Sequence, residues 1–166
     1  MKKSFWAIGA LALGFCLTVS SAARAEIVGR QFAVERLQAA LRRNLTADEL
    51  KSFKDATEAA ADDYRAERRR MAQTIVDATG VETDVVNVLL PPLGTSRTDA
   101  DPRLVTQLGT ALNRPLGRGE ERKVLKANAD NVKACRRIRR AYLDRVRKIV
   151  HVPYERLRDV VPEFVG

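Results

Sequence analysis

The chain has 166 residues and a formal net charge of +9 at pH 7, from 30 Lys and Arg against 21 Asp and Glu. Its single histidine and two cysteines are too few for a transition-metal site, and no catalytic triad, paired-carboxylate or zinc-protease pattern occurs. We therefore expect a protein that is not an enzyme and needs no cofactor or metal. The dominance of Ala, Leu, Arg, Glu and Lys favours an all-α fold.

Residues 1–25 have the features of a secretory signal peptide. Two lysines precede an apolar run over 5–19, which is short for a membrane span, and an A-x-A cleavage pattern closes the segment at 23–25. The sequence therefore predicts export to a bacterial periplasm, with a mature chain of 26–166 that forms one domain. An uncleaved N-terminal anchor is the alternative interpretation.

The first half of the mature chain predicts three helices. Apolar residues at spacings of three and four indicate helices over 31–43, 47–79 and 83–90. Thr46 with Glu49 predicts a capping box before the long helix, and the glycine after this helix is typical of a helix end. The apolar stripe of the long helix consists of Leu50, Phe53, Thr57, Ala60, Tyr64, Met71, Ile75 and Ala78.

The second half repeats this order after a linker at 94–103. It predicts helices over 104–112, about 120–150 and about 153–161, with a proline at the start of the last. The stripe of its long helix consists of Val124, Ala127, Val132, Cys135, Ile138, Tyr142, Val146 and Ile149.

The two halves align without a gap at an offset of 71 residues. Residues 33–93 and 104–164 are identical at 13 of 61 positions, which predicts a tandem duplication of one helical unit. The long helices, each about 45 Å in length, should pack as an extended hairpin or cradle, within the chain or across a homodimer. Cys135, the only cysteine of the mature chain, should be buried on its stripe, with an intermolecular disulfide as the alternative.

Positive charge is concentrated in the second half: residues 26–100 carry a net charge of −2, and residues 101–166 carry +8. Arginine clusters lie at corresponding places on the two long helices, and only the first cluster has neighbouring acids that can pair with it. Because arginine binds carboxylates bidentately, we expect the second cluster to be the stronger binding surface. The clusters are Arg65, Arg68, Arg69 and Arg70 in the first half and Arg136, Arg137, Arg139 and Arg140 in the second.

Nucleic acid is not an expected partner, because the chain is exported and poor in the aromatic residues that stack on bases. Peripheral contact with an anionic membrane or polymer is a further alternative. It predicts binding that weakens steeply with salt.

The segments 45–49 (LTADE) and 116–120 (LGRGE) lie at the same 71-residue offset, at the starts of the two long helices. Through them the chain resembles the Spy/CpxP-like periplasmic proteins, which carry two L-T-x-x-Q motifs. The resemblance implies a cradle-shaped helical dimer that binds unfolded envelope proteins without ATP, or damps an envelope stress sensor. The client contacts that it implies are Arg136, Arg137, Arg139 and Arg140, with the apolar neighbours Ile138 and Tyr142.

The sequence thus favours an exported helical binding protein, a holdase-type chaperone or envelope-stress accessory. Unfolded or acidic envelope proteins would be its clients, with Arg65, Arg68 and Arg69 as secondary contacts. The alternative is a non-catalytic structural or accessory subunit of an envelope complex. Such a subunit would expose a large apolar patch when isolated, whereas a chaperone would stay soluble alone.

Overall fold

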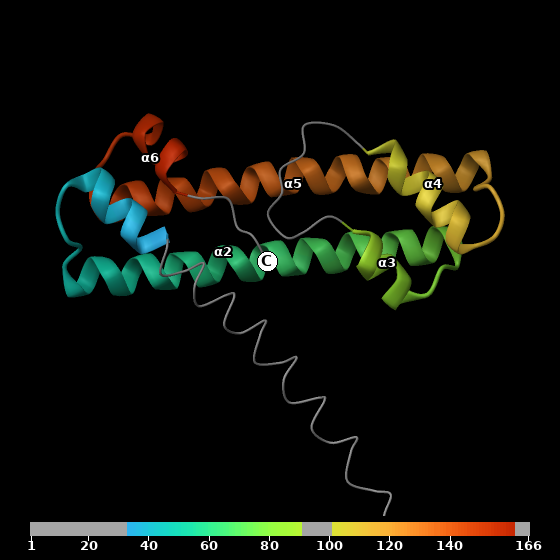
Figure 1. Cartoon of the computed structure of the whole chain (residues 1–166), viewed down its shortest axis with the longest axis horizontal. Coiled ribbons are helices and arrows are strands. Elements are labelled where there is room, and N and C mark those ends of the chain that lie inside the picture. Colours follow the sequence, from blue (N-terminus) through green and yellow to red (C-terminus); the bar gives the residue numbers. More distant parts are fainter. Residues whose placement is uncertain (1–32, 91–100, 162–166) are drawn as a thin grey trace, which may run out of the picture.

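The computed structural model describes residues 33–90 and 101–161, which form helices joined by short turns, with no β-strand among them (Figure 1). The prediction of an all-α fold is confirmed. The predicted signal peptide and positions 94–100 of the predicted linker lie outside the described residues. The helices are 33–41, α2 (Ala47–Thr79), α3 (Thr83–Leu89), α4 (Pro102–Ala111), α5 (Arg118–Val150) and α6 (Tyr154–Val160).

α2 begins and ends where its local sequence predicts. Thr46 Oγ1 accepts the backbone N–H of Glu49 at 3.2 Å, and the Glu49 carboxylate accepts the backbone N–H of Thr46 at 2.8 Å. This capping box satisfies two amides that the helix itself leaves without partners. At the other end, Gly80 adopts the left-handed conformation (φ 73°) and donates its N–H to the carbonyl of Val76.

In the second half, two helices start earlier than predicted. α4 begins at Pro102, because Asp101 accepts the backbone N–H of Arg103 at 3.0 Å and proline fits the first helical position. α5 begins at Arg118, with Gly117 as its N-cap. The Asp–Pro pair is a local start signal that the spacing of apolar residues does not reveal.

The two long helices, α2 and α5, lie antiparallel and side by side (Figure 1). The hydroxyls of Thr57 and Tyr142 are 3.1 Å apart, and further along α2 the Tyr64 hydroxyl donates to the carbonyl of Cys135 at 3.3 Å. Moving forward along α2 therefore means moving back along α5. The two apolar stripes cover each other within one chain, so a second chain is not needed to bury them.

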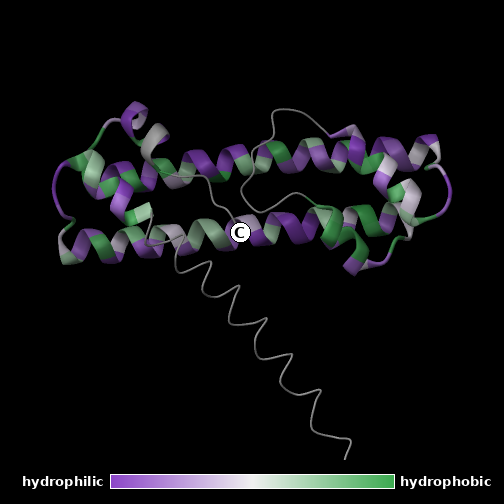
Figure 2. Cartoon of the chain, viewed as in Figure 1, coloured by the Kyte–Doolittle hydropathy of each residue, from purple (hydrophilic) through white to green (hydrophobic). Residues whose placement is uncertain are grey.

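Apolar clusters at the two ends of the molecule hold the short helices in place, and Figure 2 shows hydrophobic segments gathered there. Each cluster combines the start of one half of the chain with the end of the other half, so neither half alone contains a complete cluster. We name them after Leu37 and Leu108. The Leu37 cluster consists of Ala33, Leu37, Phe53, Ala56, Ala60, Tyr142, Leu143, Val146, Val150, Leu157 and Val161. The Leu108 cluster consists of Met71, Ala72, Ile75, Val81, Val86, Leu90, Leu104, Leu108, Val124 and Ala127.

Corresponding contacts recur 71 residues apart. Arg43 clamps Glu49 at 2.7 Å before α2, and Arg114 clamps Glu120 at 2.8 Å before α5. Each clamp is bidentate, and its carboxylate also accepts the N-cap amide of the helix that follows. Left-handed backbone occurs at corresponding positions in both halves: Arg42 and Asn113, and Gly80 and His151.

Candidate functional site

α2 and α5 have the same length and corresponding neighbours but opposite net charge. Each has 33 residues. α2 contains six Lys and Arg against eight Asp and Glu, whereas α5 contains twelve against four. The net charge of α5 is therefore +8, and that of α2 is −2. The positive charge of the protein is thus largely carried by one helix.

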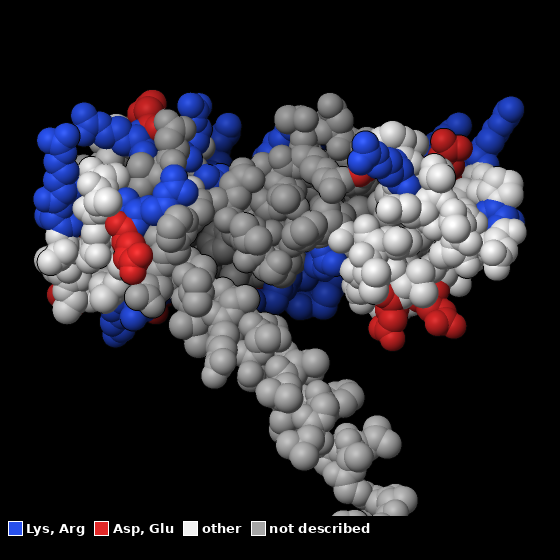
Figure 3. Space-filling view, viewed as in Figure 1, with Lys and Arg blue, Asp and Glu red and all other residues white. Residues whose placement is uncertain are grey.

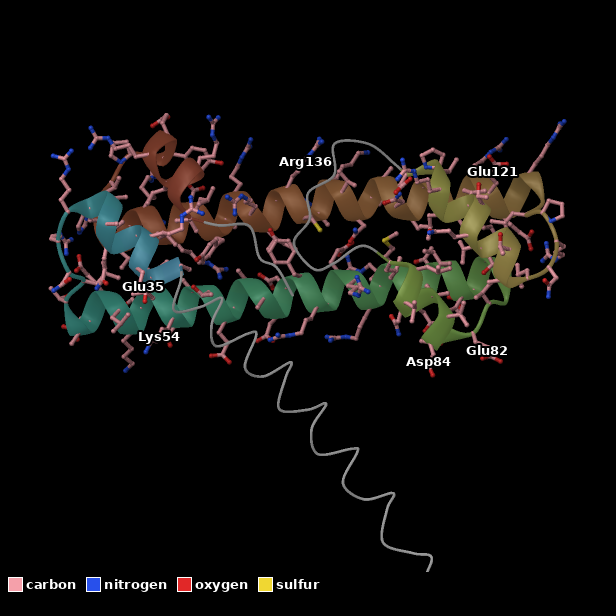
Figure 4. All side chains as sticks on the ribbon, viewed as in Figure 1. Glu35, Lys54, Glu82, Asp84, Glu121 and Arg136 are labelled. Atoms are coloured by element: carbon pink, nitrogen blue, oxygen red, sulfur yellow. The ribbon has the colours of Figure 1, made fainter. Side chains whose placement is uncertain are left out.

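The cations of α5 form a row along its exposed face. The buried residues of α5 occupy the side that faces α2, which leaves the opposite side to solvent. Figure 4 shows Arg136 on the edge of α5 away from α2, and Figure 3 shows Lys and Arg side chains along the edge that α5 and α6 form. The row spans about 39 Å at 1.5 Å per residue. Its members are Arg122, Lys126, Lys133, Arg137, Arg140 and Lys148, all exposed.

Two acids interrupt the row and leave its centre wholly basic. Asp130 accepts a hydrogen bond from Lys126 Nζ at 2.9 Å, which lowers the pKa of the Asp130 carboxyl. Asp144 lies 4.0 Å from Arg147. The thirteen residues between these two acids, 131–143, contain five Lys and Arg and no Asp or Glu. The corresponding stretch of α2, 60–72, contains three acids.

Much of the row escaped the sequence analysis, which considered only the arginine clusters. Several exposed lysines of α5 stand where α2 has acids 71 residues earlier. A position-by-position subtraction of the two halves, rather than a search for identities, reveals them. The reversed pairs are Asp55 and Lys126, Asp62 and Lys133, and Asp77 and Lys148.

Two of the predicted client contacts are engaged inside the fold. Arg68 Nη2 donates to the carbonyl of Asn87 at 2.7 Å near the end of α3, and burial lowers the pKa of the Arg68 guanidinium. Arg139 Nη2 donates to the carbonyl of Val161 at 2.9 Å and to that of Arg158 at 3.4 Å, past the end of α6. These arginines recur in the sequence at positions where each half uses one to cap its last short helix.

The other predicted arginines lie at the surface. In the first cluster, Arg65 pairs with Asp62 at 2.7 Å, and Arg70 pairs with Glu67 at 2.9 Å. Arg136 in the second cluster is exposed. Three further exposed arginines make no hydrogen bond or ion pair in the structure as described: Arg69, Arg137 and Arg140.

The apolar neighbours predicted to contact clients belong to the core. Tyr142 is only 2% exposed, and its ring centroid lies 6.4 Å from that of Phe53. Burial raises the pKa of the Tyr142 hydroxyl to about 12. Ile138 is half-buried and packs against the Leu37 cluster. Tyr142 thus presents no surface to a client, and the accessible part of the predicted site is cationic.

Cys135 occupies the interior position that its stripe predicts. The thiol is free, its residue is 6% exposed, and Sγ lies 3.8 Å from Oδ1 of Asn131. Burial raises the pKa of this thiol to about 11, which disfavours the reactive thiolate. The geometry supports the buried interpretation over an intermolecular disulfide.

Large exposed hydrophobic side chains are confined to α3 in the described part of the chain: Val85 is 36% exposed and Val88 is 84% exposed. Within residues 33–90 and 101–161, no helix is both long and apolar enough to cross a membrane. The same residues hold no group of three or more His, Cys, Asp or Glu arranged to bind a metal ion.

Comparisons of the chain with protein-family models, with curated proteins and with solved structures gave no match. The resemblance to the Spy/CpxP-like proteins therefore stays a prediction that rests on the two motif segments. The case for function is carried by the exposed side chains of α5 and their surroundings.

Proposed function

We propose that the protein is an exported, non-catalytic helical binding protein of the holdase type, or an envelope-stress accessory, that captures unfolded or acidic envelope proteins without ATP. The observation that carries the proposal is the unopposed positive charge of α5 between Asp130 and Asp144. Three exposed cations there make no ion pair with described residues: Lys133, Arg137 and Arg140.

The binding mechanism would be mainly electrostatic. A basic row with few opposing acids attracts acidic segments over a distance and raises the rate of encounter. Each exposed ion pair contributes only about 0.2–1 kcal/mol, so clients would be held by several weak contacts and released readily. Because the predicted apolar contact Tyr142 is buried, hydrophobic capture is a smaller part of this mechanism than the sequence suggested.

The first test is suppression of client aggregation by the mature chain 26–166. A reduced, unfolding acidic protein is mixed with it at near-stoichiometric ratio, and light scattering is followed at low and high salt. We expect suppression at low salt that weakens at high salt, because exposed charges are screened. No suppression at tenfold excess by a well-folded sample would refute the proposal.

Paired substitutions then locate the surface. R137S/R140S removes two exposed charges from α5, and R69S/R70S removes two exposed charges from α2. The total charge change is the same, so a loss of suppression confined to the α5 variant would identify α5 as the client surface. Equal losses in both variants would show that only net charge matters.

The accessory-subunit alternative is favoured by one observation, the exposed valines of α3. The corresponding positions in the second half hold Arg156 in place of Val85 and Asp159 in place of Val88. An apolar face on one short helix suits a permanent partner more than a transient client. This alternative predicts that the isolated protein self-associates and that V85S/V88S abolishes the association, measured by sedimentation velocity.

We also propose that the chain is a tandem duplication of one unit made of a short, a long and a short helix. The recurring clamps, left-handed residues and arginine caps at the 71-residue offset support this. Homodimerisation stays a prediction, although the burial that motivated it is supplied by α2 and α5 within one chain.

A further inference from the structure

We infer that the ligand of the α5 row is an extended acidic polypeptide segment of about twelve residues, with acidic side chains on alternate positions. This inference rests on the proposed function and specifies its partner. It follows from the length of the row, the spacing of its cations and the two acids set among them.

The spacing of the cations suits an extended chain. Along the helix axis, Lys133 lies about 6 Å from Arg137, and Arg137 lies about 4.5 Å from Arg140. Side chains on one face of an extended strand recur about every 6.6 Å. An extended peptide aligned with α5 can therefore place a carboxylate near each cation in turn, and the row of about 39 Å accommodates about twelve residues at 3.3 Å each.

Two acids within the row favour a polypeptide over a uniformly charged polymer. Asp130 and Asp144 lie at the borders of the central stretch, and Asp130 already neutralises Lys126. A lipid surface or a phosphate backbone brings negative charge to these positions as well, where it is repelled. A polypeptide can place neutral residues opposite them and carboxylates elsewhere.

The side chains beside the row also disfavour the other classes of partner. No aromatic side chain of α5 is exposed, because its single aromatic residue, Tyr142, is buried, so α5 offers no stacking platform for bases. The members of the row are all charged, so α5 has no apolar stripe to insert among lipid headgroups. Its contacts are of the kind that arginine and lysine make with carboxylates.

The test uses the mature chain 26–166 and fluorescently labelled oligo-glutamate peptides of increasing length, with binding measured by anisotropy. Because exposed ion pairs are individually weak and act together, affinity should rise until the peptide covers the row. We expect the dissociation constant to fall on the order of tenfold between four and twelve residues, and less than about twofold between twelve and twenty. Continued tightening beyond twelve residues at the same rate would overturn the inference.

Spacing is tested with two twelve-residue peptides of equal charge. One carries six glutamates at alternate positions with serine between them, and the other carries the six glutamates in one block. The alternating peptide reaches the whole row, whereas the block reaches about half of it, so the alternating peptide should bind several-fold more tightly. Equal affinity would show that the row does not read spacing.

The surface is tested with triple variants of matched charge. K133S/R137S/R140S removes three exposed cations of α5, and K51S/K54S/R69S removes three of α2. Circular dichroism and thermal melting establish that both variants are folded. The α5 variant should bind the alternating peptide on the order of tenfold more weakly, with the α2 variant close to the parent chain. Equal weakening in both would overturn the inference.

Competition arms separate the partner class from the function. Vesicles with anionic lipid, or single-stranded DNA, that bind more tightly than the alternating peptide and lose affinity in the α5 variant would replace the polypeptide by that class. Suppression of client aggregation without any length or spacing dependence would overturn this inference and leave the proposed function standing. Length-dependent peptide binding without suppression would do the reverse.

Discussion

Single residues at the helix ends determine where the backbone turns, and two of them form a natural comparison. Gly80 and His151 follow α2 and α5 at corresponding positions, both in the left-handed region, with φ values of 73° and 54°. A Cβ added at Gly80 would meet no atom within 4 Å, so a substitution there changes only the conformational energy of the backbone. Glycine adopts this conformation without the steric cost that a side chain adds.

Exchanging these residues should therefore move stability in opposite directions. We expect Gly80→Ala to destabilise the fold by about 1 kcal/mol, and His151→Gly to stabilise it by about 0.5–1 kcal/mol. Urea denaturation followed by circular dichroism measures both. A gain of stability from Gly80→Ala would contradict the left-handed assignment.

The clamps at Glu49 and Glu120 make the fold sensitive to acid. Hydrogen bonds from Arg43 and from the N-cap backbone lower the pKa of Glu49 from 4.5 to about 2, and Arg114 with the Gly117 amide does the same for Glu120. A folded-state pKa below the unfolded value means that the contribution to stability is present above pH 4.5 and is lost as pH falls toward 2.

Accordingly, E49Q/E120Q should melt at a lower temperature than the parent chain at pH 6, and the two melting curves should converge as pH falls from 4.5 to 2. Thermal melts at a series of pH values provide the measurement. Glu58→Gln, at an exposed position of α2, serves as the control and should show no such convergence. A constant difference at every pH would argue against the clamps as the cause.

At the scale of the element, the short helix α6 depends on one arginine of α5. The partly buried Arg139 donates to two carbonyls at the end of α6, whereas its exposed neighbour Arg140 donates to none in the described part of the chain. Hydrogen bonds from charged groups at such sites each contribute about 1.5–3 kcal/mol when little exposed, and less when water reaches them.

We therefore expect Arg139→Ala to cost about 1 kcal/mol of stability and to increase hydrogen exchange of the α6 amides, while Arg140→Ala leaves both unchanged. Arg68→Ala should act on α3 in the same way. If Arg139→Ala and Arg140→Ala behave alike, the capping role of Arg139 is wrong.

The elements themselves could be predicted from local sequence, whereas the uses of their side chains could not. The capping box and Gly80 determine the ends of α2 because their hydrogen bonds lie within a few residues. The packing of Tyr64 on Cys135 joins residues far apart in the chain, and no local pattern encodes it. For the same reason, Arg139 and Arg140 look alike in sequence although one caps a helix and the other faces solvent.

At the scale of the whole molecule, the two ends of the described chain lie in the same place. Ala33 and Val161 both belong to the Leu37 cluster, just as Leu90 and Leu104 both belong to the Leu108 cluster. Each cluster is thus entered by one half of the chain as the other half leaves it. Chains whose ends lie close together tolerate circular permutation.

A permuted chain that runs from 101 to 166 and continues from 26 to 90 should therefore form the same helices and clusters. We expect the same circular dichroism spectrum and a melting temperature within a few degrees of the mature chain, since the described contacts are all retained. A permutant that is unfolded or aggregated would show that the connection between Leu90 and Asp101 is itself essential.

Near the centre of the molecule, position 64 lies against position 135, its own counterpart 71 residues along the chain. Two identical chains with this packing would have to place the same residue on both sides of that contact, Tyr against Tyr or Cys against Cys. A single chain is free of this requirement and can set one large side chain against one small one. The same freedom permits an acidic α2 and a basic α5 on matching frameworks. Fusion of the halves is what makes a molecule with one charged working face and one nearly neutral back attainable.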